Sequence, residues 1–254
     1  MYDAVRAAPA GRATPAHFTR RLADLGYDGV VIRNGDVLGG SDDHDGEGVD
    51  ATAETPTAAT IRERHGIDVV DGYEVRADGP ESASGHVGNY RRSCTLLLVR
   101  GGSPEMNRFA VESERVDVLT APLAGNGDLN HVIADAAREN GVRIEIDLSP
   151  VLRAAGGERV QAIAALRRLR EVVEARDAPV VVTAGADSHL GVRAPREVIA
   201  VGEAVGFDAA TIEAGLREWG RLADRNRERR RDRFVAPGVR RGRYDSDDDP
   251  RGDR

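Results

Sequence analysis

Residues 67–76 read Ile67-Asp68-Val69-Val70-Asp71-Gly72-Tyr73-Glu74-Val75-Arg76, the longest of six apolar and β-branched runs in the chain. Continuous runs of this kind indicate strands of a parallel sheet that are buried on both faces. We expect the other strands at residues 29–33, 95–100, 116–121, 142–148 and 179–184, with a weaker one at residues 3–5.

Segments with helical signals separate these strands. Thr14 and Ser103 each precede a proline, and a cap residue followed by Pro is typical of a helix start. Regular alternation of strands and helices predicts an α/β fold, a TIM-like (β/α) barrel, which typically needs about 250 residues. A doubly wound open sheet is the alternative. Because no clean eighth strand is present, we expect an incomplete or distorted barrel. The expected helices cover residues 14–25, 59–65, from 103 onward, 130–140, 159–177, 194–205 and 208–230.

The pattern predicts one domain over residues 1–233, with polar segments outside its core. Residues 34–56 are rich in Gly, Asp and Thr and predict a long, exposed acidic loop that buries little area. Residues 234–254 include Asp245, Asp247, Asp248 and Asp249 and predict a disordered C-terminal tail.

The charge composition indicates a halophile. All 36 basic residues are arginine, 43 residues are acidic, and the formal net charge is −7. Such a balance ordinarily argues against a nucleic-acid partner. In a halophile, however, general surface acidity hides local basic patches. No apolar run reaches the roughly eighteen residues of a transmembrane helix, and no secretory signal is present, so we expect a cytoplasmic protein without membrane contact.

A barrel enzyme would carry its chemistry at the C-terminal ends of the strands. Glu74, Glu145 and Asp147 lie there, and Asp187 and His189, which follow the last strand, are the most metal-like pair. A phosphoesterase that uses two metals needs more convergent ligands than these. We therefore expect no catalytic residue and no bound metal in this chain, with Asp187 and His189 as vestigial candidates.

Arginines at strand and loop ends are the more prominent feature, because the planar guanidinium suits phosphate groups and RNA backbones. Residues 85–92 look like a loop that offers Arg91 and Arg92 to RNA, although ordinary surface arginines in a turn explain it equally well. The arginine run at residues 225–233 is typical of a solvated helix end, with an RNA or partner contact as the alternative. Our candidates for RNA binding are Arg76, Arg91, Arg92, Arg100, Arg153, Arg193 and His189.

Taken together, seven segments resemble the archaeal and eukaryotic RNase P protein family p30, also called Rpp30. The similarity covers about residues 2–240, and the composition points to a haloarchaeal member. The resemblance implies a barrel related to the polymerase-and-histidinol-phosphatase (PHP) phosphoesterases that has lost its metal site. The segments are Leu25–Asn34, Gly66–Arg76, Val99–Gly102, Asn107–Glu112, Arg115–Leu119, Glu145–Pro150 and Ala186–His189.

The resemblance also implies a function, namely a protein subunit of the ribonucleoprotein that removes the 5′ leader from precursor tRNA. In that enzyme the RNA subunit catalyses the reaction with magnesium, so this chain is expected to bind no cofactor and to be inactive alone. The implied partners are the RNase P RNA, a Pop5-type subunit and other RNase P proteins, with precursor tRNA as the substrate of the complex.

Two alternatives remain beside this reading. The first is a stand-alone PHP-type metal-dependent phosphoesterase, which the small number of metal ligands disfavours. The second is a barrel enzyme that acts on a phosphorylated metabolite, and it lacks a phosphate-binding signature after the seventh strand.

Overall fold

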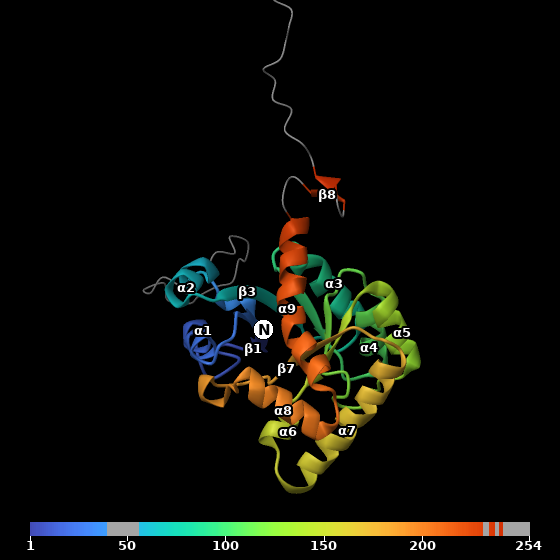
Figure 1. The fold of residues 1–254 in the computed structure, drawn as a ribbon. Coiled ribbons are helices and arrows are strands. Elements are labelled where there is room, and N and C mark those ends of the chain that lie inside the picture. Colours follow the sequence, from blue (N-terminus) through green and yellow to red (C-terminus); the bar gives the residue numbers. More distant parts are fainter. Residues whose placement is uncertain (40–55, 231–233, 237–238, 241–254) are drawn as a thin grey trace, which may run out of the picture.

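The computed structural model describes residues 1–39, 56–230, 234–236 and 239–240 and contains a sheet of seven parallel strands (Figure 1). The strands are hydrogen-bonded to one another in chain order and curl into a nearly closed barrel. The barrel predicted from the sequence is thus confirmed, weak first strand included. The strands are β1 (Tyr2–Val5), β2 (Gly29–Ile32), β3 (Asp68–Val75), β4 (Leu96–Arg100), β5 (Val118–Thr120), β6 (Arg143–Asp147) and β7 (Val180–Thr183).

Helices surround the sheet largely where their start signals lie. Thr14 and Ser103 cap their helices by accepting backbone N–H groups of His17 and Met106. Within the described residues, no helix is both long and apolar enough to cross a membrane. The helices are α1 (Pro15–Asp24), α2 (Ala58–His65), α3 (Pro80–Tyr90), α4 (Pro104–Glu112), α5 (His131–Asn140), α6 (Ser149–Arg153), α7 (Gly156–Ala175), α8 (Pro195–Val205) and α9 (Ala209–Arg229), with 3₁₀ turns η1 (Gly35–Val37) and η2 (His189–Gly191).

The loop expected at residues 85–92 is wrong, because α3 continues to Tyr90. Gly85 and Gly88 lower the helix propensity of this segment by about 1 kcal/mol each relative to alanine. Burial of Ala83 and Val87 on one face of the helix outweighs that loss.

The inside of the barrel is layered, because side chains alternate along each strand between the interior and the surrounding helices. Toward the N-terminal ends of the strands the interior is apolar and forms a core cluster of its own with residues of α9. Further along the same strands, the inward positions become polar. The apolar positions include Val31, Val70, Leu98, Val118 and Val181, and the polar ones include Arg33, Glu74, Thr120, Glu145 and Thr183.

Helix α9 occupies the gap where an eighth strand would lie. It packs against the two edge strands, β1 and β7. Trp219 of α9 is fully buried and donates its indole N–H to the carbonyl of Val182 in β7 over 2.8 Å. Two glycines allow this close approach, because a Cβ on Gly215 would lie 2.5 Å from Val182 and one on Gly220 would lie 2.6 Å from Tyr2.

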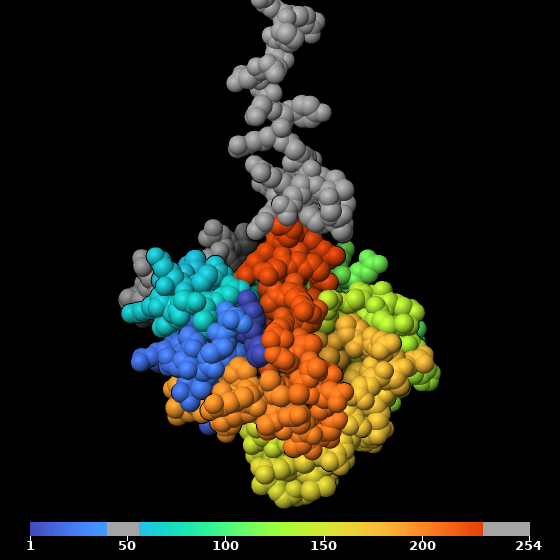
Figure 2. All heavy atoms as spheres, viewed as in Figure 1, coloured from blue at the N-terminus to red at the C-terminus, as the bar shows by residue number. Residues whose placement is uncertain are grey.

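We call the end of the barrel at which the strands begin its floor. The C-terminal half of α9 crosses this floor. Asn226 and Arg225 both bond to Asp117, at 2.9 and 2.8 Å, and Arg227 lies 2.7 Å from Asp68. Asp68 begins β3, and Asp117 directly precedes β5. Figures 1 and 2 show α9 as a long ridge across the face that is turned to the viewer.

The segment at residues 34–56 is not wholly an exposed loop. Asn34 exchanges two hydrogen bonds of 2.9 Å with the backbone of Ala7, and Leu38 is buried in the core. Residues 34–39 therefore belong to the fold, because Asn34 is bonded to the segment that follows β1, and η1 packs against β3. The rest of the expected loop, up to residue 55, lies outside the described residues.

The expected tail at residues 234–254 begins with structure. Two short antiparallel strands, β8 (Phe234–Ala236) and β9 (Val239–Arg240), pair with each other. This part of the expected tail is thus not without secondary structure. The five aspartates of the tail lie outside the described residues.

Candidate nucleic-acid interface

A buried ion cluster fills the barrel toward the C-terminal ends of the strands. Arg33, Glu74 and Glu145 are 7%, 8% and 2% exposed. The Arg33 guanidinium donates to Glu145, and its Nη1 lies 3.4 Å from Glu74 Oε1. The hydroxyl of Thr120 donates to Glu74 at 2.8 Å, and the backbone N–H of Ala121 donates to Glu145 at 3.2 Å. Both carboxylates are therefore paired and hydrogen-bonded.

Arg33 supplies the positive charge that a metal would supply in this cluster. Burial by itself would lower the pKa of Arg33, but the charge of Glu145 and of neighbouring carboxylates outweighs burial and raises it. Glu74 also pairs with Arg6. A metal could bind these carboxylates only by displacing an arginine, so the residues do not fit the metal site of a hydrolytic barrel. Over residues 1–39 and 56–230, no group of three His, Cys, Asp or Glu side chains is placed to hold a metal ion.

Asp187 and His189 make their contacts elsewhere. Asp187 lies 3.4 Å from Arg12, and both side chains are more than half exposed. The ring of His189 stacks on that of His17, with ring centroids 5.3 Å apart. The sequence-predicted vestigial pair thus faces the start of the chain and α1.

Asp147 ends β6 beside the ion cluster, and Ser149 donates to it twice, from the backbone N–H at 2.8 Å and from the hydroxyl at 3.0 Å. Burial, followed by the charge of Glu145, raises the pKa of Asp147 from 3.8 to about 6, although Arg33 opposes the shift. The folded state therefore binds a proton at Asp147 more tightly than the unfolded state. The stability that this group contributes is fully present at pH values below its pKa in the unfolded state. It is lost as pH rises through its pKa in the folded state, about 6.

We expect Asp147→Asn to stabilise the protein at pH 7 by on the order of 1–2 kcal/mol, since one pKa unit corresponds to about 1.4 kcal/mol. Asparagine keeps an oxygen for the backbone N–H of Ser149 and removes the charge next to Glu145. The advantage should shrink as pH falls from 7 to 4, because the wild-type carboxyl is then protonated in the folded state. Urea unfolding at several pH values measures this. An advantage that does not change with pH would contradict the assignment.

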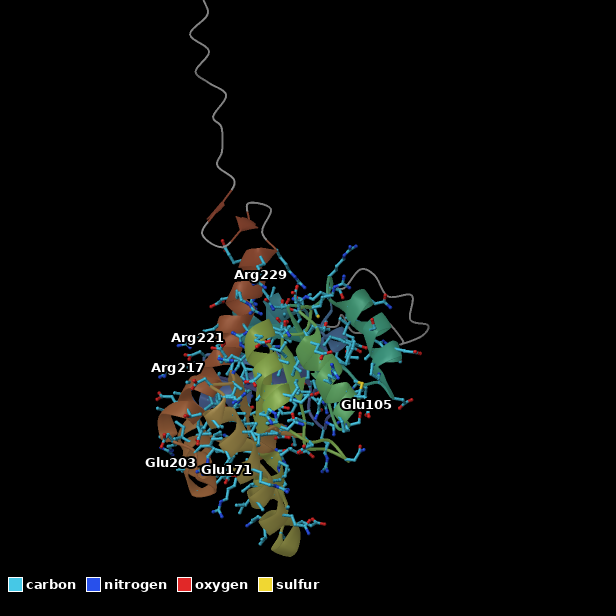
Figure 3. The ribbon with its side chains drawn as sticks, turned by 90° about the vertical axis from the view of Figure 1, so that its right-hand side faces the viewer. Glu105, Glu171, Glu203, Arg217, Arg221 and Arg229 are labelled. Carbon is cyan, nitrogen blue, oxygen red and sulfur yellow. The ribbon has the colours of Figure 1, made fainter. Side chains whose placement is uncertain are left out.

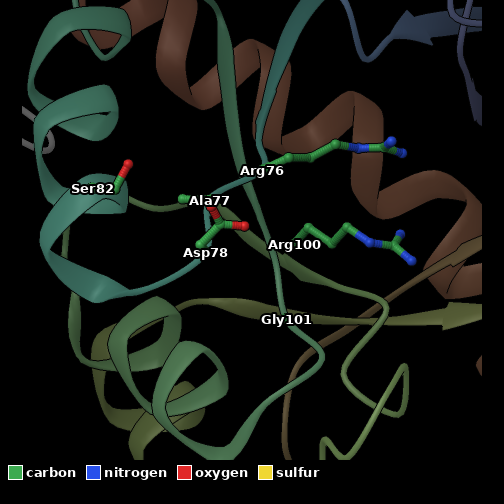
Figure 4. A pocket seen from close by; sticks show the side chains of 6 residues that line it. All are labelled: Arg76, Ala77, Asp78, Ser82, Arg100 and Gly101. Carbon is green, nitrogen blue, oxygen red and sulfur yellow. The ribbon is translucent and has the colours of Figure 1, made fainter.

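A pocket of about 390 Å³ opens where β3 and β4 end. Arg76 and Arg100 extend from these neighbouring strands side by side in the same direction (Figure 4). Burial, and then the charge of Arg100, lower the pKa of Arg76. Arg76 is paired with Glu74 at 2.9 Å, whereas Arg100 has no hydrogen-bond or ion-pair partner in the described part of the chain. An anion in this pocket would relieve the repulsion between the two guanidiniums.

Three further candidates lie at the same end of the barrel. Arg153 ends α6 and donates to the carbonyl of Ala184, just beyond β7, at 3.1 Å. Arg193 follows η2, and its carbonyl accepts the hydroxyl of Tyr27 at 2.9 Å. His189 begins η2. These three residues and Arg76 follow the C-terminal ends of strands, and Arg100 is the last residue of β4.

Arg91 and Arg92 lie at the opposite end, because they connect a helix to the start of β4. Arg91 donates to Asp117 at 2.6 Å and to the carbonyl of Arg115 at 3.1 Å. The sequence-predicted arginines are therefore divided between the two ends of the barrel and do not form one face.

The partners of Arg33 were not predicted from the sequence. Arg33 directly follows β2 and lies two residues after Val31, so it continues the inward-facing side of that strand. This period of two is the sequence signal that could have identified Arg33 as a buried residue.

Comparisons of the sequence and of the fold with known proteins point to the same family. A family model described as RNase P subunit p30 matches residues 2–231. Ribonuclease P protein component 3 from Halorubrum lacusprofundi is 52% identical over 97% of this chain and 100% of its own length. The protein of the same name from Haloarcula marismortui is 51% identical over 94% of this chain and 96% of its own. A chain in a cryo-EM structure of archaeal ribonuclease P with mature tRNA has the same fold, with a TM-score of 0.77 at 22% identity over 96% of this chain and 99% of its own.

Proposed function

This chain belongs to the RNase P subunit p30 family, and from that premise we propose how it serves as a protein subunit of ribonuclease P. The match over residues 2–231 carries the assignment, and the identity to haloarchaeal relatives agrees with the lysine-free, acidic composition. The chain acts within a complex of RNA and proteins that matures the 5′ end of tRNA. The family expected from the sequence is confirmed.

In this proposal, RNA contacts the end of the barrel at which the strands end, which we call the mouth. Arg76 and Arg100 line one pocket and extend in the same direction, and the side chain of Arg100 lacks an acidic partner among the residues that the structure describes. Two adjacent guanidiniums bind a phosphate group well, because each offers a planar pair of donors. Arg153, Arg193 and His189 extend the contact around the same end of the barrel.

Catalysis belongs to the RNA subunit and its magnesium ions in this proposal, and a Pop5-type subunit is the direct protein partner. The observation that supports a non-catalytic role is the buried cluster in which Arg33 pairs with Glu74 and Glu145. Carboxylates that are already neutralised by arginine are poor ligands for a second cation. The stand-alone phosphoesterase therefore remains only as an outcome of the test.

Reconstitution tests this function. We expect the RNase P RNA with its protein subunits to cleave precursor tRNA less efficiently when this chain is omitted. The chain alone should cleave neither precursor tRNA nor a simple phosphoester with added magnesium, manganese or zinc. Cleavage by the chain alone that is lost in Glu74→Gln would favour the phosphoesterase.

The double variant Arg76→Gln/Arg100→Gln tests the mouth. We expect RNA affinity of the reconstituted complex to fall about tenfold or more, since a hydrogen bond to a charged group contributes about 1.5–3 kcal/mol. The matched control is Arg64→Gln/Arg168→Gln, which removes two exposed arginines of α2 and α7. Equal RNA affinity and salt dependence in the two double variants would exclude the mouth as an RNA contact.

A further inference from the structure

A second group of arginines surrounds a pocket of about 380 Å³ on the floor of the barrel. Its residues come from three separate parts of the sequence: the turn after α3, the turn before β5 and the end of α9. Figure 3 shows Arg229 near the end of α9, on the side of the molecule opposite Glu105 at the start of α4. We call this group the floor cluster; it consists of Arg91, Arg92, Glu114, Arg115, Asp117, Asn226, Arg229 and Arg230.

One buried carboxylate organises the floor cluster. Asp117 is only 4% exposed, and Arg91, Arg225 and Asn226 all donate to it at 2.6–2.9 Å. Arg230 donates to the carbonyl of Arg91 at 3.2 Å. These bonds fix the turn after α3 against the end of α9. The cluster is therefore preorganised and does not depend on a partner to assemble it.

Three guanidiniums of the cluster are left without partners. Arg92, Arg115 and Arg229 make no side-chain hydrogen bond or ion pair within residues 1–39 and 56–230. Five arginines face only two acidic residues in the lining of the pocket, although the chain as a whole carries a net charge of −7. Like charges held together in this way repel one another, so an anion that binds among them is favoured.

We propose that the floor cluster binds phosphate groups of an RNA backbone, as a second RNA contact on the side of the barrel opposite the mouth. Every residue that lines the pocket is charged or an amide, and none is apolar. The buried centre of a protein–protein interface is apolar and poor in charge, so a protein partner fits this pocket less well. Guanidiniums that form no internal pairs are the side chains that bind phosphates bidentately. The inference rests on the proposed function, since it requires an RNA partner.

Because both ends of one rigid barrel then contact RNA, the chain would bridge two RNA segments rather than cap one. The sequence separates the two groups of floor arginines by more than one hundred residues. Their union at one site depends on α9 crossing the floor.

The triple variant Arg92→Gln/Arg115→Gln/Arg229→Gln tests the floor cluster, because these exposed side chains form no hydrogen bond or ion pair within the described residues. The probe is the RNase P RNA, titrated with the full set of protein subunits over a range of KCl concentrations. We expect the affinity to fall about tenfold or more. Each lost phosphate contact should also lower the slope of log K against log [KCl] by about 0.7–0.9.

The matched control is Arg20→Gln/Arg64→Gln/Arg168→Gln, which removes the same charge from exposed positions on α1, α2 and α7. Equal affinity and equal slope for the two triple variants would overturn the proposal. It is also overturned if the floor variant binds RNA like the control but no longer assembles with the other protein subunits in the absence of RNA. Wild-type protein that fails to support cleavage would instead contradict the proposed function, so the two failures are distinguishable.

Discussion

Replacing Arg33 by methionine should destabilise the protein by about 3–5 kcal/mol at pH 7, the usual cost of removing one partner from a buried ion pair. Methionine has a similar length but leaves the carboxylates of Glu74 and Glu145 without the guanidinium between them. Arg6 and Arg76 still pair with Glu74, so Glu145 is the side chain left without an ion-pair partner among the described residues. Such a loss is a large part of the total stability of a typical domain, about 5–15 kcal/mol.

The pH dependence distinguishes this loss from a packing defect. Without Arg33, the charged form of Glu145 is buried without a countercharge, so the variant should recover stability as pH falls. Adding Glu145→Gln to Arg33→Met should restore part of the loss at pH 7, whereas a packing defect would be unaffected by it. Arg12→Met serves as the control, because it removes an arginine from an exposed pair with Asp187. Urea unfolding between pH 5 and 8 gives all these values, and equal losses for Arg33→Met and Arg12→Met would contradict the role of Arg33.

Replacing Trp219 by alanine should cost about 3–5 kcal/mol, as for other fully buried aromatic side chains. Trp219 fills the interior of the barrel near its floor, and the guanidinium carbon of Arg33 lies 5.9 Å from the centre of its ring. The indole N–H donates to the carbonyl of Val182. That carbonyl belongs to β7, an edge strand, so no eighth strand replaces the lost donor.

Two further variants separate the contributions of volume and hydrogen bonding at Trp219. Trp219→Phe keeps most of the ring but not the N–H, and should cost about 1–3 kcal/mol, the penalty of an unsatisfied buried acceptor. Arg221→Ala, on the exposed face of the same helix, controls for effects on helix propensity. Chemical unfolding followed by circular dichroism suits the whole series, since Trp219 is the single tryptophan of the chain. A Trp219→Ala protein as stable as Arg221→Ala would show that α9 does not hold the barrel closed.

The strands were predictable because burial on both faces leaves a local mark in the sequence. Six runs of β-branched residues each became a strand within a few residues of the expected bounds. The helix over residues 80–90 was missed because Gly85 and Gly88 weaken its local signal, and packing of Ala83 and Val87 decides its formation. Propensity acts locally, whereas packing depends on what surrounds a segment after folding.

The distribution of the arginines between the two ends of the barrel was harder to predict from the sequence than the strands were. Arg76 and Arg91 lie fifteen residues apart in the chain but at opposite ends of the barrel, because α3 returns the chain to the start of the next strand. Without α3 between them, the two arginines would belong to one loop. The end of the barrel at which a side chain lies follows from whether it comes after a strand or before one.

The sequence by itself determined the order of strands and helices, the parallel sheet and the family to which the chain belongs, because each leaves a mark in consecutive residues. Only the tertiary structure decided that Arg33 neutralises Glu145, that Asp117 joins Arg91 to Arg225, and that α9 closes the barrel in place of an eighth strand. These pairs are separated by 26 to 112 residues along the chain. An ion pair or a buried contact depends on distance in space, which a linear pattern of residue types does not encode.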